Sequence, residues 1–580
     1  MRWAALSAAM APFFGVAPDQ PSGFLASPAW QVLQKELQWD DNTTFFAPNP
    51  GALYAAVHDL AARALAAAKA VRPFAPSSQQ GWRCSLTGQT EWLCTDPAQL
   101  QTSYRQQTDT LWARIAERRP AWAKAGEHLG ALPALKRLWP TMFADEVGRA
   151  VGSIASAGAK RFVVSTHTMA LAHQLDRWLT GGAPGADKLR EELAGQPAEP
   201  VALPRKLALD HSQHPAFDLA KRLPALLDSQ DDLEDSGPTK LIEKTLGGAG
   251  ATRVETYYSL LLMDGDHMGA WLAGGDAHAI SYRSSFHPQV RAGFDAHALH
   301  QPLLRAYAQQ KRALSPNRHL AISGALNDFS LVVARQVIEN EYLGRLIYAG
   351  GDDVLAMLPV ADLLPAMQRL RVAYAGHDPA HADGDRQGLA LKNGFALLDN
   401  PRSGRRLMRM MGERATASCG AVVAHHQAPL AAVLRELRLA EKRAKGEGGR
   451  DAFSLSLIKR SGGALLVTAK WGEPVALLSA LRMFLAADGV SRRAVFNTLV
   501  WLKDLPPDQP EMLTALLAYQ LDRQSDAAAR QAHDVPKLAR RLSDLAFNEQ
   551  QRKAGADPRQ WLHNFLSAAE FLARETRRVD

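Results

Sequence analysis

The most informative run of residues in this chain is Tyr348-Ala349-Gly350-Gly351-Asp352-Asp353-Val354-Leu355-Ala356. Apolar residues flank its centre, at Leu346-Ile347 and from Val354 to Leu358. This pattern predicts two strands joined by a tight turn, because Gly350 and Gly351 can take the positive φ that such turns require. The turn then carries two adjacent carboxylates at its tip. Since like charges repel, the pair usually needs a cation, and Mg²⁺ with a phosphate ligand suits it best.

A second acidic motif lies upstream, in Ser259-Leu260-Leu261-Leu262-Met263-Asp264-Gly265-Asp266-His267-Met268-Gly269. Its apolar run indicates a buried strand with acids at the carboxyl end, where open sheets bind ligands. Between the two motifs, residues 319–339 predict a helix, because apolar residues recur there at spacings of three and four. A Gly-Gly-Asp-Asp run alone could be an ordinary acidic turn. Strand, helix and acid-tipped hairpin in this order instead predict a palm domain with a two-metal site for phosphoryl transfer.

These motifs resemble the large subunit of type III CRISPR–Cas effector complexes, specifically its type III-B (Cmr) branch. The matching blocks follow the family order over residues 160 to 470. They are Arg161–Thr168, Leu262–Gly269, His319–Ser323, the Gly-Gly-Asp-Asp hairpin, Thr416–His426 and the helix through Ala440–Lys445.

The resemblance implies an α+β fold, a ferredoxin-like palm related to nucleotide cyclases and GGDEF-type enzymes, with large helical domains. Members bind ATP with two Mg²⁺ or Mn²⁺ ions and link AMP units into cyclic oligoadenylates once guide RNA has paired with target RNA. The expected partners are therefore the CRISPR guide RNA, the target RNA, RAMP-type backbone subunits and the small subunit.

By matching positions, the resemblance also implies the site residues. Asp264, Asp352 and Asp353 are the expected catalytic residues. The expected metal ligands are Asp264, Asp352 and the carbonyl of Gly265, with Asp353 and Asp266 as supporting or alternate ligands.

Five further residues are expected to bind the nucleotide: Gly350, Gly351, Ser323, Lys442 and Lys445. Two alternatives stay open for this group. The lysines could instead interact favourably with the carboxyl end of their own helix. Ser323 could be a small packing residue.

Composition indicates a large protein of several domains. The chain has 580 residues, 47% of them hydrophobic, so it can bury large cores and should form roughly three or four domains. A net charge of +8 suits a partner with phosphates, although an evenly spread charge would mean little. Its three cysteines indicate a reducing, cytoplasmic compartment. No signal peptide, membrane span or membrane partner is expected.

Four domains are expected along the chain. Residues 1–80 would be a degraded or partial first palm, 81–245 a Cys-containing loop and helical domain, 246–471 the catalytic cyclase-like palm, and 472–580 a helical bundle. The loop from Cys84 to Cys94 resembles the family's metal-binding insertion, but Thr87 stands where a second thiolate would be. Two thiolates do not complete a four-ligand site, so zinc is not expected.

An HD nuclease, which many members of the family carry, is expected to be absent. His-Asp pairs occur at His58-Asp59, His377-Asp378 and His533-Asp534, but none has the supporting ligands of a two-metal nuclease. Two other functions stay open. The palm could join AMP to another small molecule, or the chain could be a catalytically silent scaffold for guide RNA and other subunits.

Overall fold

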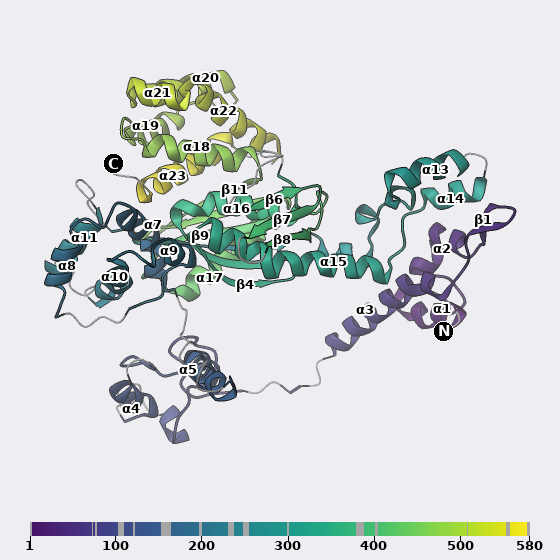
Figure 1. Cartoon of the computed structure of the whole chain (residues 1–580), viewed down its shortest axis with the longest axis horizontal. Helices are drawn as coiled ribbons and strands as arrows, with labels where there is room; N and C mark the ends of the chain where they lie inside the picture. The colour runs from purple at the N-terminus through teal and green to yellow at the C-terminus, as the bar shows by residue number, and fades with distance from the viewer. Residues whose placement is uncertain are drawn as a thin grey trace. The chain divides into compact units, whose positions relative to one another are not determined.

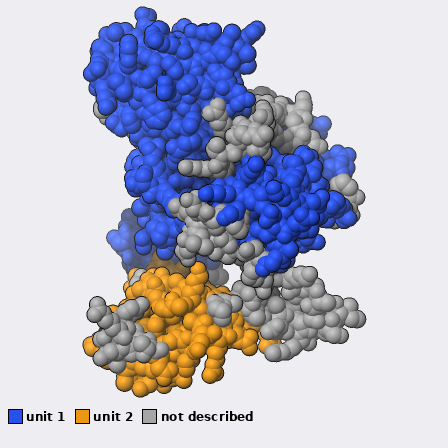
Figure 2. Space-filling model, turned by 90° about the vertical axis from the view of Figure 1, so that its left-hand side faces the viewer, with its two compact units in different colours: residues 1–64, 164–580 blue, residues 65–163 orange. Residues whose placement is uncertain are grey.

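The computed structural model describes residues 3–71, 74–75, 78–101, 109–119, 122–151, 164–195, 200–229, 237–247, 254–298, 301–378, 388–400, 404–506, 508–552 and 557–576. The chain divides into two compact units, residues 1–64 with 164–580 and residues 65–163 (Figure 2). Part of the first sequence block, Arg161 to Val163, lies outside the described residues. The four expected domains stay a prediction.

The first unit is built around a six-stranded sheet with the strand order β11-β10-β9-β3-β5-β4 (Figure 1). The strands are β3 (Tyr257–Gly265), β4 (Arg345–Gly350), β5 (Asp353–Pro359), β9 (Ala417–His425), β10 (Ala452–Ile458) and β11 (Ala464–Lys470). β3 pairs antiparallel with both β5 and β9, while β9 and β10 are parallel. Long apolar runs form these strands because the sheet is covered on both faces.

Helices join the strands in the order of a ferredoxin-like fold. After β3, α15 (Pro316–Asp328) continues into the π-helical segments η7 (Phe329–Val333) and η8 (Gln336–Glu341). After β5, α16 (Val360–Ala375) leads toward β9. The order β9-β3-β5-β4 with these two helices is a βαββαβ unit, which confirms the predicted palm.

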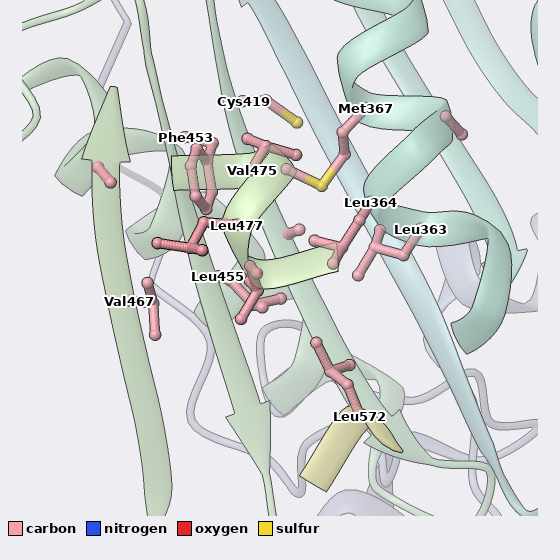
Figure 3. Packing of buried hydrophobic residues seen from close by; sticks show 14 of the residues in the cluster. Leu363, Leu364, Met367, Cys419, Phe453, Leu455, Val467, Val475, Leu477 and Leu572 are labelled. Carbon is pink, nitrogen blue, oxygen red and sulfur yellow. The ribbon is translucent and has the colours of Figure 1, made fainter. Parts of the chain in front are cut away.

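One face of the sheet packs against α16 and the carboxyl-terminal helices. Leu455 and Val467 of the strands meet Leu364 of α16 and Leu477 of α18 in this core (Figure 3). The helices of this end are α18 (Glu473–Ala486), α19 (Arg493–Leu502), α20 (Pro510–Arg523), α21 (Ala527–His533), α22 (Val535–Arg552) and α23 (Pro558–Glu575). The structure therefore shows helices after residue 472, as expected.

The opposite face packs against two other helices, α7 (Thr166–Thr180) and α17 (Leu430–Lys445). Further helices complete this side of the unit: α8 (Ala186–Glu192), α9 (Arg205–His211), α10 (Phe217–Ser229) and α11 (Gly237–Gly247). Because α17 follows β9 and ends beside β3, it brings its last turn to the end of the sheet that carries the acids.

A small antiparallel sheet is inserted between α16 and β9. Its strands are β6 (Leu389–Lys392), β7 (Phe395–Asn400) and β8 (Gly404–Arg409). Asp328 of α15 accepts hydrogen bonds from Arg406 Nη2 and from the backbone N–H of Arg409. These contacts fasten the inserted sheet to the palm helix.

An amino-terminal lobe belongs to the same unit. It holds α1 (Trp3–Phe14), α2 (Pro28–Leu33), the part of α3 (Tyr54–Ala70) up to residue 64, and the hairpin of β1 (Leu37–Asp40) and β2 (Thr43–Phe46). Its apolar core includes Leu6 and Met10, and it is completed by Phe294, Leu304 and Tyr307. The last three come from α13 (Pro288–Ala298) and α14 (Pro302–Gln309), in the long connection between β3 and α15. α12 (Met268–Ala273) opens that connection.

The second unit contains α4 (Leu111–Arg118) and α5 (Ala131–Val151). A small core there includes Cys84, Trp92 and Trp112, and both Cys84 and Cys94 are free thiols. The expectation of no zinc stays a prediction. In the part of the chain that the structure describes, no helix has the length and apolar character to cross a membrane.

Candidate active site

Three carboxylates from two separate motifs meet at one end of the palm sheet. Asp264 is next to last in β3, while Asp352 and Asp353 form the tip of the β4–β5 hairpin. The Asp353 and Asp264 carboxyl groups lie within hydrogen-bonding reach of each other, and the charges of Asp264 and Asp352 act on each other. The structure thus brings together the three residues expected to be catalytic.

The hairpin turn has two residues, Gly351 and Asp352, between the paired Gly350 and Asp353. Gly351 has a φ of 63°, as the first position of a type II′ turn requires. The expectation of a positive φ at Gly350 is wrong. A Cβ on Gly350 would instead lie 2.4 Å from the Tyr348 hydroxyl, so glycine there leaves room for the Tyr348 ring.

The surroundings of the two hairpin acids make ionisation costly. Burial raises the pKa of Asp353 to about 7, with further contributions from the hydrogen bond to Asp264 and the charges of Asp264 and Asp352. Burial also raises the pKa of Asp352, although its own backbone N–H and that of Gly265 donate to the carboxylate. A raised pKa on neighbouring acids in one site is typical of functional carboxylates.

Lys445 supplies the positive charge beside these acids. It lies in the last turn of α17, where its ammonium donates to Asp264 Oδ2 and pairs with Glu441 Oε1 at 2.6 Å. Burial lowers the pKa of Lys445, but the hydrogen bonds to Asp264 and Glu441 outweigh it and raise the pKa overall. Lys445 therefore lies at the carboxylates, as the expectation that it binds a nucleotide requires.

Gly265, the last residue of β3, lies close to Tyr374 and to Asp352 of the hairpin. A Cβ at this position would be 2.5 Å from the Tyr374 hydroxyl and 2.9 Å from both the Cβ and Oδ2 of Asp352. No larger residue fits without moving these groups. Burial, followed by the charges of Asp352, Asp264 and Asp266, raises the pKa of Tyr374.

Sequence reasoning missed Tyr374. It lies at the end of α16, far along the chain from both acidic motifs. Its helix is largely buried and apolar, so a tyrosine there reads as a core residue. Only the position of β3 against the end of α16 shows that the hydroxyl reaches the site.

Asp266 is held by three donors. Its side chain is 1% exposed and accepts from Thr416 Oγ1 at 2.8 Å, from Ser418 Oγ at 2.7 Å and from the backbone N–H of Asp451 at 2.9 Å. These bonds join the ends of β3, β9 and β10. They indicate a structural role for Asp266, and its expected role as an alternate metal ligand stays a prediction.

Two other expected nucleotide-binding residues lie on helix surfaces. Ser323 is exposed on α15 and Lys442 is exposed on α17. Within the described ranges, neither side chain forms a hydrogen bond or ion pair with the three carboxylates. Their roles stay predictions.

The donor set fits a hard divalent cation. Asp264, Asp352, Asp353 and the Gly265 carbonyl offer only oxygen atoms, which Mg²⁺ and Mn²⁺ prefer. Across the described residues, no three His, Cys, Asp or Glu side chains are already arranged around a metal position. The Lys445 ammonium instead neutralises part of the charge at Asp264.

Comparisons with known proteins find a palm domain in this part of the chain. The family model of the Cas10/Cmr2 second palm domain matches residues 257–454, which include all three carboxylates and Lys445. The CRISPR system Cmr subunit Cmr2 of Pyrococcus furiosus is 32% identical over 248 residues, 42% of this chain and 23% of that protein. The CRISPR system CMR subunit Cmr2 of Saccharolobus solfataricus is 42% identical over 87 residues, 15% of this chain and 8% of that protein.

Solved structures share the fold. A chain of the type III-B Cmr-beta complex in the apo state matches with a TM-score of 0.58 and 14% identity, covering 84% of this chain and 58% of that chain. The same type of complex bound to cognate target RNA gives 0.59 and 14%, covering 85% and 59%. This chain thus spans less than two thirds of these proteins. The palm-domain match over residues 257–454 and the related Cmr2 sequences support a type III-B Cmr large subunit, as the sequence motifs predicted.

Proposed function

We propose that this chain is a metal-dependent nucleotidyltransferase that converts ATP into cyclic oligoadenylates. In this reaction the 3′-hydroxyl oxygen of one nucleotide forms a bond to the α-phosphorus of the next. The bond between that phosphorus and pyrophosphate breaks, and the hydroxyl proton is released. The observation that carries the proposal is the convergence of Asp264, Asp352 and Asp353 with Lys445 at one end of the palm.

Each group has a defined task in the proposed site. Asp264, Asp352 and the Gly265 carbonyl would hold Mg²⁺ or Mn²⁺, with Asp353 as a supporting carboxylate. When bound, these ions neutralise charge on the triphosphate and make the 3′-hydroxyl easier to deprotonate. Lys445 offers an ammonium beside Asp264 for phosphate oxygens.

The expected partners follow from the relatives. One structural relative is a Cmr-beta complex bound to cognate target RNA. We propose that this chain likewise acts inside a multi-subunit ribonucleoprotein, with guide RNA, RAMP-type subunits and the small subunit, and that target RNA starts synthesis. The net charge of +8 is consistent with a phosphate-bearing partner.

The experiment uses the assembled complex with labelled ATP, Mn²⁺ and matching target RNA, followed by mass analysis of the products. The double variant Asp352→Ala with Asp353→Ala should lose product by at least roughly 10³-fold while complex assembly and RNA binding persist. The matched control is Asp40→Ala with Asp41→Ala, which removes an adjacent acid pair from the β1–β2 hairpin of the same chain. It should leave synthesis unchanged.

Two results would contradict the proposal. Product that survives the Asp352 and Asp353 double change would show that the chemistry is elsewhere. A wild-type complex that makes no nucleotide product would favour the scaffold function. A product that contains AMP joined to another small molecule would keep the site and change only the acceptor.

A further inference from the structure

The hydroxyl of Tyr374 is buried without a partner. The side chain is 1% exposed, and none of the residues that the structure describes forms a hydrogen bond with its oxygen. Leaving a buried hydroxyl unpaired is unfavourable, so such groups need an explanation in a folded protein. A ligand that the structure lacks is one explanation.

The position of this hydroxyl indicates which ligand it would meet. It lies 2.5 Å from the point where a Cβ on Gly265 would be, and Asp352 Oδ2 lies 2.9 Å from the same point. The ring is held edge-on against Phe329, with 5.2 Å between the ring centroids. Because a tyrosine hydroxyl lies on the ring axis, a fixed ring fixes the oxygen beside the carboxylates.

We propose that Tyr374 is a ligand-binding residue of the carboxylate site. Its hydroxyl donates a hydrogen bond to an oxygen atom that arrives with the occupant of the site. That oxygen belongs either to the water shell of a bound cation or to a phosphate of the nucleotide. The inference rests on the proposed function, because it requires a cation or nucleotide at Asp264 and Asp352.

The chain offers a matched control in Tyr258. This residue is 0% exposed, its hydroxyl also has no partner in the described part of the chain, and it lies near the start of β3. It packs in the core beneath α7 and α17, whereas the carboxylates lie at the other end of β3. Removing its hydroxyl therefore tests the loss of a buried unpaired group without touching the site.

The test measures binding of Mn²⁺ to the full chain by calorimetry and thermal unfolding, with and without a non-hydrolysable ATP analogue. Without metal, Tyr374→Phe and Tyr258→Phe should both unfold at the wild-type temperature or above it, since each loses an unpaired hydroxyl. With ligand, Tyr374→Phe should weaken binding about tenfold, the usual effect of losing one hydrogen bond to a charged group. Tyr258→Phe should bind like wild type.

The measurements with and without the ATP analogue distinguish the two possible sources of the oxygen atom. Weaker binding of Mn²⁺ alone assigns the hydroxyl to the water shell, and weaker binding only with the analogue assigns it to a phosphate. Equal affinity of Tyr374→Phe and wild type in both arms overturns the inference and leaves the proposed function standing. A wild-type chain that binds neither Mn²⁺ nor the analogue overturns both.

Discussion

Two hairpins of this chain carry adjacent aspartates at their tips, Asp40-Asp41 between β1 and β2 and Asp352-Asp353 between β4 and β5. At the first hairpin, Asp40 is exposed and accepts from the backbone N–H of Asn42, which lowers its pKa. At the second, burial and the neighbouring Asp264 raise the pKa of Asp353 to about 7. The same local sequence pattern therefore shifts the pKa of an aspartate in opposite directions at the two hairpins.

An acidic turn alone therefore does not make an active site. In an acidic hairpin that stands alone, water and local backbone N–H groups stabilise the charged carboxylates. The second hairpin lies against the end of β3, where Asp264 adds a third carboxylate and Lys445 a balancing ammonium. Each prediction below changes one part of that difference.

The largest effect is expected from Asp264→Ala, which removes the strand-end partner and leaves the second hairpin more like the first. Nucleotide synthesis by the assembled complex should fall by roughly 10³-fold. The pKa of Asp353 should also fall in the metal-free chain, because its hydrogen bond to Asp264 is lost. Product analysis and carboxyl NMR titration measure these two changes. Unchanged synthesis by Asp264→Ala would show that Asp264 is not part of the active site.

The next effect concerns the close approach of β3 to the hairpin. Gly265→Ala adds a Cβ that collides with the Tyr374 hydroxyl and with Asp352. We expect synthesis to fall about 10²-fold, as displacements of about 1 Å at a reacting centre do. The control is Gly293→Ala in α13, where an added Cβ would meet no other group within 4 Å. Equal rates for the two variants would contradict this argument.

A stability effect is expected beneath the site. Asp266→Ala removes the acceptor of three hydrogen bonds that join the ends of β3, β9 and β10. The free energy of unfolding should drop by about 2–4 kcal/mol, because buried donors are left unpaired. Denaturant titration measures it, with the exposed Asp40→Ala as the control that should change little. A drop no larger than that of the control would show that the hydrogen bonds of Asp266 do not stabilise the joined ends of β3, β9 and β10.

The smallest effect is a pH-dependent gain from Asp353→Asn in the metal-free chain. The pKa of Asp353 is raised in the folded state, so wild-type stability falls as the pH rises from about 4 toward 7. The variant has no charge there, so its advantage in unfolding temperature should grow across the same window. Asp40→Asn should show no such gain, because the pKa of Asp40 is lowered. If the difference in unfolding temperature between Asp353→Asn and wild type did not change with pH, the proposed repulsion among the buried carboxylates would be contradicted.

The palm could be predicted from the sequence because its signals are local. An apolar run that ends in acids, a helical spacing and a glycine turn each predict one element, and their order predicts a palm domain. The ferredoxin-like form of that palm came from the family resemblance. The convergence of Asp264 with Asp352 and Asp353 followed from the same order. The site therefore needed no long-range information beyond strand order.

Other features depend on contacts between distant segments. Tyr374 reaches the site only because α16 ends beside Gly265, and Gly350 is small because the Tyr348 ring lies against it. The inserted sheet of β6 to β8 also went unpredicted, since its strands are short and carry weak periodic signals. Packing between elements decides such features.

The core of the amino-terminal lobe has a consequence for synthesis of the chain. Leu6 and Met10 are covered in part by Phe294, Leu304 and Tyr307, which follow roughly 290 residues later. At the usual 5–20 residues per second, a ribosome needs about 15–60 s to reach them. During that interval the apolar faces of α1 and α2 lack part of their cover. Exposed apolar surface of this kind favours aggregation of the nascent chain, so slowed translation before residue 308 should increase aggregation.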